Sequence, residues 1–232
     1  NRSGEQEDLQ ELRERYSSGR QELWPKPHID SAVRTGFMDI GVLPQVSYPA
    51  DNPYSKEKSL LGKLLFFDPR LSASKQISCA SCHDPQLGFG DGKSLAHGHG
   101  RREGKRNAMT LYNVAFYKSF MWDGRAKSLE DQVLLPTQDH LEMNTPLDTL
   151  IAHVKAVPGY AAYFEQAFGD KQITLFRIQQ ALATFERGIV SYPTKFDRFV
   201  QGQADALNDQ ELTGLHLFRT KARCINCHNT PL

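Results

Sequence analysis

Every cysteine of this chain lies in one of two five-residue motifs, and this arrangement constrains the protein more than any other feature. The motifs are CASCH, residues 79–83, and CINCH, residues 224–228. In each motif two residues separate the thiols, and a histidine follows the second thiol directly. Four cysteines in an exported protein would by default predict two disulfides, but the histidines favour a different chemistry.

Cys-x-x-Cys-His is the attachment motif of c-type haem. The two thiols, one turn apart, add to the two vinyl groups on one edge of the porphyrin, and the histidine ligates the iron from beneath. The sequence therefore predicts two covalently bound haems c. The residues that would hold them are Cys79, Cys82, His83, Cys224, Cys227 and His228.

A zinc site of four cysteines is the strongest alternative. Paired zinc knuckles usually lie within ~15 to 20 residues of each other, whereas more than half of the chain separates Cys82 from Cys224. Zinc also leaves both histidines unexplained. A thioredoxin-like pair lacks the flanking strands, and a phosphate loop lacks a glycine at Leu87.

Composition excludes several partners. The 28 basic and 27 acidic residues leave a net charge of +1, which argues against a nucleic-acid partner. The most apolar stretch, Leu60 to Phe67, is interrupted by Gly62 and Lys63 and is too short to span a membrane. The chain opens with a polar run that lacks the apolar core of a signal peptide. We expect an exported, periplasmic protein whose signal peptide is absent from this chain.

Helical periodicity dominates, so the sequence predicts an all-α fold. Ser128 with Asp131, and Asn208 with Glu211, are typical of capped helix starts, and Thr145 is a further cap candidate. Each haem motif follows a predicted helix. The expected helices lie near residues 9–16, 55–66, 147–157, 175–189 and 209–220.

Several blocks of the sequence resemble the bacterial di-haem cytochrome c peroxidases and the related MauG-type enzymes. The blocks begin at about Leu61 and continue to the last residue. They include LGKLLFFDPRLS, CASCHDP, RNAMTLYNVAF, FMWDGRAKSLEDQ, LEM, FERGIVS, FDRFV and LFRTKARCINCH. The resemblance implies that the first haem is peroxidatic and that the second takes in and relays electrons.

This resemblance implies two cytochrome c-like helical haem domains, the second of them incomplete here. Residues 1–52 would be an N-terminal extension wrapped on the core, or a linker. Residues 53–192 would form the peroxidatic haem c domain, and residues 193–232 the start of the electron-transfer domain. The sixth ligand of the second haem would then lie beyond Leu232, or that haem is ligated differently.

Four side chains match catalytic positions of the family. Trp122 corresponds to the tryptophan between the two haems, and Glu142 to the distal acid that moves a proton between the peroxide oxygens. A carboxylate suits this role where burial adjusts its pKa. Gln132 and Pro136 fall where the family places other residues of the pocket.

Two further residues match metal ligands of the family. His99 lies where classical members carry a removable sixth ligand of the first haem; His97 is a weaker candidate, and HGHG also fits a solvent loop. Asn107 matches a calcium ligand, although one oxygen cannot make a Ca²⁺ site alone. The basic residues from Arg101 to Arg106 are either a solvated loop or partners of haem propionates or of an acidic donor.

The expected enzyme is a peroxidase that reduces hydrogen peroxide to water with electrons from a small donor protein, a cytochrome c or a cupredoxin. One alternative is a MauG-type enzyme that uses peroxide to oxidise residues of a partner protein. Another is a di-haem electron carrier without catalysis. The sequence leaves a homodimer open.

Overall fold

The described residues, 8–191 and 193–229, form helices joined by loops and short 3-10 turns. This part of the chain contains three isolated β-bridges and no β-strand in the computed structural model. The predicted all-α fold class is therefore confirmed. Within the same residues, no helix combines the length and the apolar character needed to cross a bilayer.

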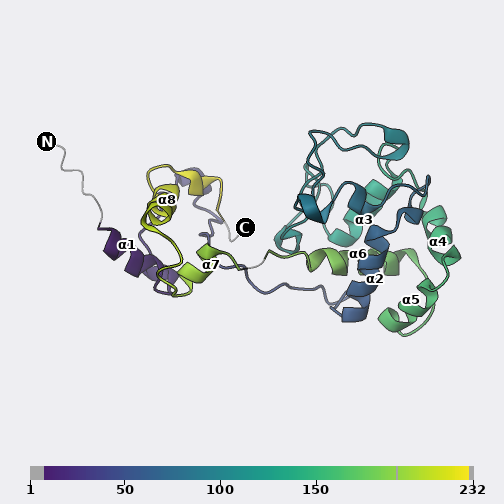
Figure 1. Ribbon diagram of the computed structural model, residues 1–232, viewed down its shortest axis with the longest axis horizontal. Helices are drawn as coiled ribbons and strands as arrows, with labels where there is room; N and C mark the ends of the chain where they lie inside the picture. Colours follow the sequence, from purple (N-terminus) through teal and green to yellow (C-terminus); the bar gives the residue numbers. More distant parts are fainter. Residues whose placement is uncertain (1–7, 192, 230–232) are drawn as a thin grey trace. The chain divides into compact units, whose positions relative to one another are not determined.

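The chain divides into two compact units, each described here by itself (Figure 1). One unit is Val46–Ser191 and holds CASCH. The other is formed by the residues up to Gln45 together with those after Ser191, and it holds CINCH. Each haem motif thus lies in its own unit. The three domain ranges expected from the sequence stay a prediction.

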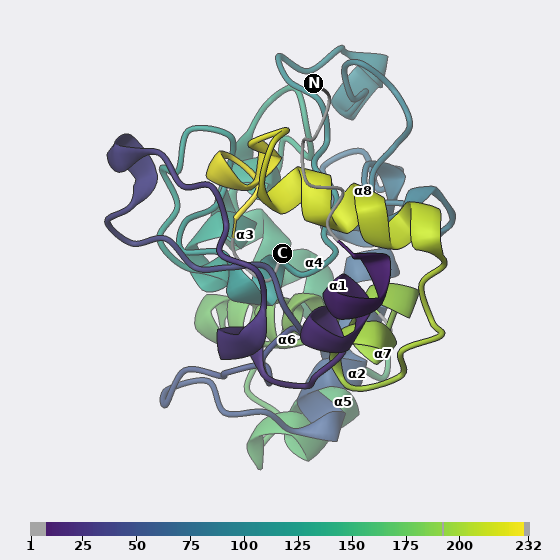
Figure 2. The ribbon, with the colours of Figure 1, turned by 90° about the vertical axis from the view of Figure 1, so that its left-hand side faces the viewer.

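The unit that holds CINCH is built from both ends of the chain. Its helices are α1 (Leu9–Tyr16), α7 (Lys195–Val200) and α8 (Asp209–Arg219). α1 contacts α8, and Figure 2 shows the purple N-terminal helix beside the yellow one. Its core side chains are Leu12, Tyr16, Trp24, Phe199, Val200, Leu207 and Leu212.

Arg219 of α8 fixes the N-terminal segment in this unit. Its side chain is 1% exposed and donates to the Tyr16 hydroxyl (3.0 Å) and the Pro25 carbonyl (2.8 Å), and it pairs with Asp39. Its guanidinium also lies 5.1 Å from the centre of the Trp24 ring. A buried cation needs its donors satisfied. Residues of the N-terminal segment satisfy them, so this segment packs on α8.

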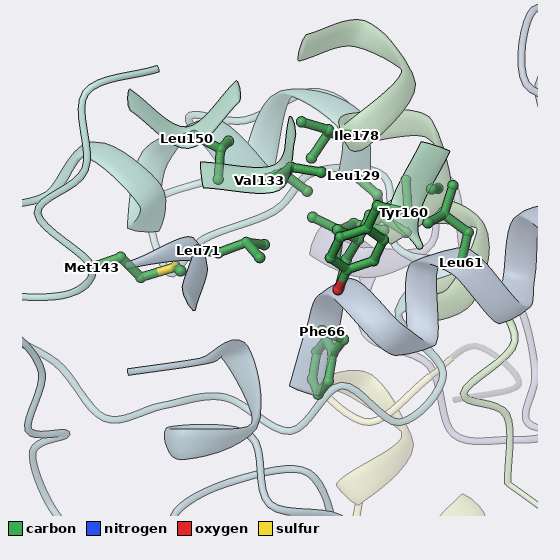
Figure 3. Close-up of a cluster of buried hydrophobic side chains, with 14 of the residues drawn as sticks. Leu61, Phe66, Leu71, Leu129, Val133, Met143, Leu150, Tyr160 and Ile178 are labelled. Carbon is green, nitrogen blue, oxygen red and sulfur yellow. The ribbon is translucent and has the colours of Figure 1, made fainter. Parts of the chain in front are cut away.

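The Val46–Ser191 unit is organised around α6. Its helices are α2 (Lys56–Phe67), α3 (Leu129–Gln138), α4 (Leu147–Ala156), α5 (Tyr160–Phe168) and α6 (Leu175–Arg187). α6 packs on α2 and on α3, and α5 packs on α2. Figure 3 shows apolar side chains from these elements converging in one core. Those labelled there are Leu61, Phe66, Leu71, Leu129, Val133, Met143, Leu150, Tyr160 and Ile178.

Gly62 allows the close approach of α2 and α6. A Cβ at this position would overlap the carbonyl oxygen of Ala181, and it would lie 2.8 Å from Cβ of Phe185. Helix interiors disfavour glycine, so its presence here reflects packing. The backbones of the two helices approach each other at Gly62 and Ala181 more closely than a side chain at position 62 permits.

The helix starts follow their predicted caps with one exception. Ser128 caps α3, and Asn208 with Glu211 forms a capping box on α8. Thr145 does not cap α4: Pro146 occupies the N-cap position, and the Thr145 hydroxyl donates to the Met143 carbonyl at 3.0 Å. Thr145 is fully buried, so its hydroxyl bonds the nearest carbonyl instead of the helix.

We expect Gly62→Ala to destabilise the Val46–Ser191 unit by about 1 to 3 kcal/mol or more, because overpacking against helix backbone cannot relax at a flexible side-chain tip. Chemical denaturation followed by circular dichroism measures this change. Gly214→Ala on α8 is the matched control: no atom lies within 4 Å of its Cβ position, and the helix gains roughly 0.5 to 1 kcal/mol. Equal effects of both substitutions would contradict the packing argument.

Candidate active site

A cavity of about 340 Å³ opens beside the CASCH motif within the Val46–Ser191 unit. A smaller cavity of about 60 Å³ adjoins it and shares part of its wall. The larger one is lined by the loop of residues 104–111, by residues 120–125, by one face of α3 and by the segment after α3. The predicted residues on its wall are Cys82, His83, Asn107, Trp122, Gln132, Pro136 and Glu142. Cys79 lines the smaller cavity.

The two cysteine motifs fold into the same local structure. In CASCH the amides of Cys82 and His83 both donate to the carbonyl of Cys79, at 3.2 and 3.0 Å. In CINCH the amides of Cys227 and His228 donate to Cys224 in the same pattern, at 3.1 and 2.9 Å. All four thiols are free. One such turn presents two thiols and a histidine together, as thioether attachment requires.

The backbone of the glycine-rich loop orients the imidazole of His83. Nδ1 of His83 lies 3.0 Å from the carbonyl oxygen of Phe89. A carbonyl only accepts, so Nδ1 carries the hydrogen and Nε2 keeps its lone pair for a metal. Gly88 has φ 67°, and the amide of Phe89 bonds to the carbonyl of Asp84 at 2.8 Å. Gly88 and Gly92, both at positive φ, thus allow the chain to turn beside His83.

The protonation states around CASCH fit a haem. Burial lowers the pKa of His83, and backbone hydrogen bonds with Phe89 and Met109 oppose this shift without reversing it. The lowered pKa favours the neutral imidazole, which is the form that ligates iron. Burial, with Glu142 adding to it, raises the pKa of the Cys82 thiol to about 11. Burial also raises the pKa of Cys79.

Glu142 lies at the end of the segment that follows α3. Burial raises the pKa of its carboxyl, Asp139 raises it further, and Arg125 opposes the shift. The Glu142 amide donates to the carbonyl of Asp139 at 3.0 Å. A carboxyl that holds its proton above the ordinary range, on the wall of a cavity, has the properties of a proton shuttle.

Gln132 and Pro136 line the same cavity from one face of α3. They are four residues apart, so the helix places one above the other. The carbonyl of Pro136 accepts from the amide of Met143 at 3.1 Å. The last turn of α3 is thereby tied to the segment that carries Glu142.

A tight loop presents Trp122 at the rim of the cavity. The loop is closed by paired backbone hydrogen bonds between Phe120 and Ala126. The indole nitrogen of Trp122 donates to the carbonyl of Asn107 at 2.9 Å. The ring is 59% exposed although it lines the cavity. It therefore connects the cavity with the surface of this unit.

Two arginines flank this loop and share one carboxylate. Asp123 accepts from Arg106 at 3.0 Å and from Arg125 at 2.8 Å. Both arginines and Lys105 line the cavity. Cations at the mouth fit the propionates of a haem. Of the basic residues predicted between Arg101 and Arg106, only Lys105 and Arg106 are on the described cavity wall. Arg125, from outside that cluster, lines the cavity with them.

His99 is coupled to Glu142 through its backbone. The His99 amide donates to the Glu142 carbonyl at 2.7 Å, and a Cβ on Gly98 would overlap the Leu141 carbonyl. Gly98 lines the cavity, whereas neither His97 nor His99 is on its described wall. Nδ1 of His99 is buried without a hydrogen-bond partner among the described residues. Iron ligation by His99 stays a prediction.

The calcium prediction for Asn107 also stays a prediction. Its side-chain nitrogen donates to the carbonyl of Lys93 at 2.5 Å. Across the described ranges, no three His, Cys, Asp or Glu side chains are grouped as a metal site. On CINCH, His228 is exposed and its ring lies 6.2 Å from that of Phe218.

Sequence reasoning missed Glu186 of α6. Its side chain lines both cavities and is 5% exposed. A signal existed: Glu186 stands four residues after Leu182 and three before Ile189. It therefore lies on the apolar stripe of the helix, where a charged residue is unexpected.

The cavity, its paired thiols and its buried imidazole together form a candidate haem site. The sequence pattern described as di-haem cytochrome c peroxidase matches residues 56–205. The chain belongs to this family.

Relatives of both kinds within the family are similar to the chain. The methylamine utilization protein MauG of Methylorubrum extorquens is 45% identical over 80% of this chain and 53% of its own length. The cytochrome c551 peroxidase of Nitrosomonas europaea is 39% identical over 84% of this chain and 59% of its own. A solved MauG-like protein associated with microbial copper homeostasis has a TM-score of 0.70 at 31% identity, covering 76% of this chain and 52% of that one. The chain spans about half the length of the curated relatives it matches.

We expect Cys79→Ser with Cys82→Ser to remove one covalent haem, and Cys224→Ser with Cys227→Ser to remove the other, because each turn presents one pair of thiols. Intact mass of denatured protein, together with a pyridine haemochrome assay, counts the attached haems. The parent protein should carry two. Loss of both haems from either double variant would contradict independent attachment.

Proposed function

We propose that the chain forms part of a di-haem c-type peroxidase that reduces hydrogen peroxide to water. The observation that carries the proposal is the convergence of His83, Glu142 and Trp122 on one cavity. A haem attached at Cys79 and Cys82 would supply an iron that binds peroxide and passes electrons. In total, one peroxide, two electrons and two protons give two waters.

The side chains around the cavity have separate roles in the proposed reaction. His83 offers Nε2 to the iron while its Nδ1 hydrogen stays on the Phe89 carbonyl. Glu142 takes a proton from one peroxide oxygen and returns it to the other as the O–O bond breaks. Gln132 and Pro136 shape the wall beside it.

Trp122 is proposed to pass electrons from the second haem to the first. Its indole lines the cavity and is exposed at the surface of the unit. The hydrogen bond to Asn107 holds the ring in one orientation, which favours transfer over a fixed distance. The electrons would come from a small redox protein, a cytochrome c or a cupredoxin. Covalent attachment of both haems, a periplasmic location and a calcium ion at Asn107 belong to the same proposal.

A MauG-type function is the second candidate. Two relatives named MauG are 45% and 41% identical to the chain, whereas two relatives named peroxidases are 39% and 38% identical to it. In this reading the same cavity uses peroxide to oxidise residues of a partner protein. Glu142 and Trp122 keep their roles, and the electrons come from the partner.

We expect Glu142→Gln to lower peroxide turnover on the order of 10²- to 10⁴-fold, because an amide cannot shuttle the proton. Stopped-flow or steady-state assays with a reduced donor measure this. Glu165→Gln, on an exposed surface of α5, is the control and should retain full activity. A Glu142→Gln variant as active as its parent would favour a plain electron carrier.

The resting spectrum should separate the two candidates. If His99 ligates the first haem, that haem is six-coordinate when oxidised and reacts with peroxide after reduction of the second haem. His99→Gly should then react without reduction. A five-coordinate first haem that reacts directly in the parent supports the MauG-type function. Absorption and electron paramagnetic resonance spectra of the oxidised protein make the distinction.

A further inference from the structure

Glu186 is a buried acid inside the wall of the proposed haem cavity. It is 5% exposed, and its Oε2 has no hydrogen-bond partner among the described residues. The side chain borders both the larger and the smaller cavity. Buried polar groups are nearly always paired, so an unpaired carboxyl oxygen facing a cavity calls for an explanation.

The nearby cations do not neutralise this acid. Arg187, the next residue, forms a bidentate ion pair with Glu130 of α3, with N–O distances of 2.6 and 2.8 Å. Lys58 of α2 donates to the side chain of Asn52 and to the carbonyl of Pro53. Burial raises the pKa of Glu186 to about 8, Glu130 raises it as well, and Arg187 opposes the shift.

The elements packed on α6 supply few other titratable groups. On the motif side Cys79 borders the smaller cavity together with Glu186, and the charge of Glu186 contributes to the raised pKa of Cys79. In a haem-bearing protein Cys79 is a thioether and does not titrate. Glu142 lies across the cavity wall. The turn Val114–Phe116, which also packs on α6, carries no ionisable side chain. No described hydrogen bond links Glu186 to His83.

We propose that Glu186 is a redox-linked proton site of the first haem. When one electron from the donor reduces ferric iron to ferrous iron, the Glu186 carboxylate takes one proton from solvent. When the iron is oxidised again, the electron and the proton both leave. The proposal rests on the proposed function, since it requires a haem at Cys79 and Cys82.

The physical reason is the low dielectric around the carboxyl. An added electron on the haem makes the cavity one charge more negative, and a buried carboxylate interacts with that charge far more strongly than one in water. Protonation of Glu186 removes the repulsion. By linkage, a group that binds its proton more tightly in the reduced state makes reduction harder as pH rises.

The test is a potentiometric titration of the haem from roughly pH 5 to pH 9, which brackets the ordinary and raised pKa of a glutamic acid. A background with Cys224→Ser and Cys227→Ser leaves the first haem as the reporter. At fixed potential, the ratio of oxidised to reduced haem should rise up to about tenfold per pH unit, as one coupled proton requires. In the Glu186→Gln variant this pH dependence should be lost, and at high pH its haem should be easier to reduce than the haem of the parent.

Two outcomes would overturn the proposal while leaving the proposed function intact. One is an unchanged pH dependence in Glu186→Gln with the haem attached. The other is that Glu165→Gln, which removes an exposed charge, has the same effect as Glu186→Gln. A parent protein that carries no haem would overturn the proposed function as well.

Infrared spectroscopy of the parent tests protonation of Glu186 directly, and it does not require Glu186→Gln to fold. The reduced-minus-oxidised difference spectrum of the parent should gain a carboxylic acid C=O band. The band should persist in Glu142→Gln. Its absence from the parent, or its loss in Glu142→Gln, would overturn the assignment to Glu186.

Discussion

The approach of α6 to α2 is the contact on which the Val46–Ser191 unit depends. Gly62 removes the side chain that would otherwise hold the two backbones apart. α2 then contacts the turn that begins CASCH, and α6 carries Glu186 to the cavity wall. A change in the packing of these two helices would therefore alter the core, the turn of the CASCH motif and the position of Glu186 together, because all three depend on α2 and α6.

The rest of the site lies on α3 and on loops, and a few hydrogen bonds to backbone groups hold the loops in place. The Phe89 carbonyl orients His83, and the Asn107 carbonyl orients Trp122. The His99 amide ties its loop to the carbonyl of Glu142. Because these partners belong to the main chain, the geometry depends on loop conformation more than on side-chain identity. Loops fixed in this way can carry catalytic groups with little loss of position.

Two acids border the cavity, and burial raises the pKa of both. Glu142 stands on a loop, with Arg125 near enough to oppose the shift. Glu186 stands in the last turn of the packed helix α6, and the adjacent Arg187 is engaged by Glu130. These environments suit different roles. We propose that the loop acid moves a proton between the oxygens of peroxide, and that the helix acid takes up one proton when the local charge becomes more negative.

The sequence by itself predicted covalent haem attachment, and it determined the all-α fold class and most helix starts. These properties are local: a Cys-x-x-Cys-His turn, a 3.6-residue period and a capping box each need only a few adjacent residues. Through the family resemblance it also named Trp122, Gln132, Pro136 and Glu142, which the structure places on one cavity.

Only the tertiary structure decided which distant groups meet. Arg219 could be identified as the buried anchor of the N-terminal segment only after Tyr16, Pro25 and Asp39 were placed around it. Glu186 could be recognised only once α6 had turned it toward a cavity formed by other segments. Burial and pairing are properties of the packed chain, because they depend on neighbours far away in sequence. No local pattern reports them.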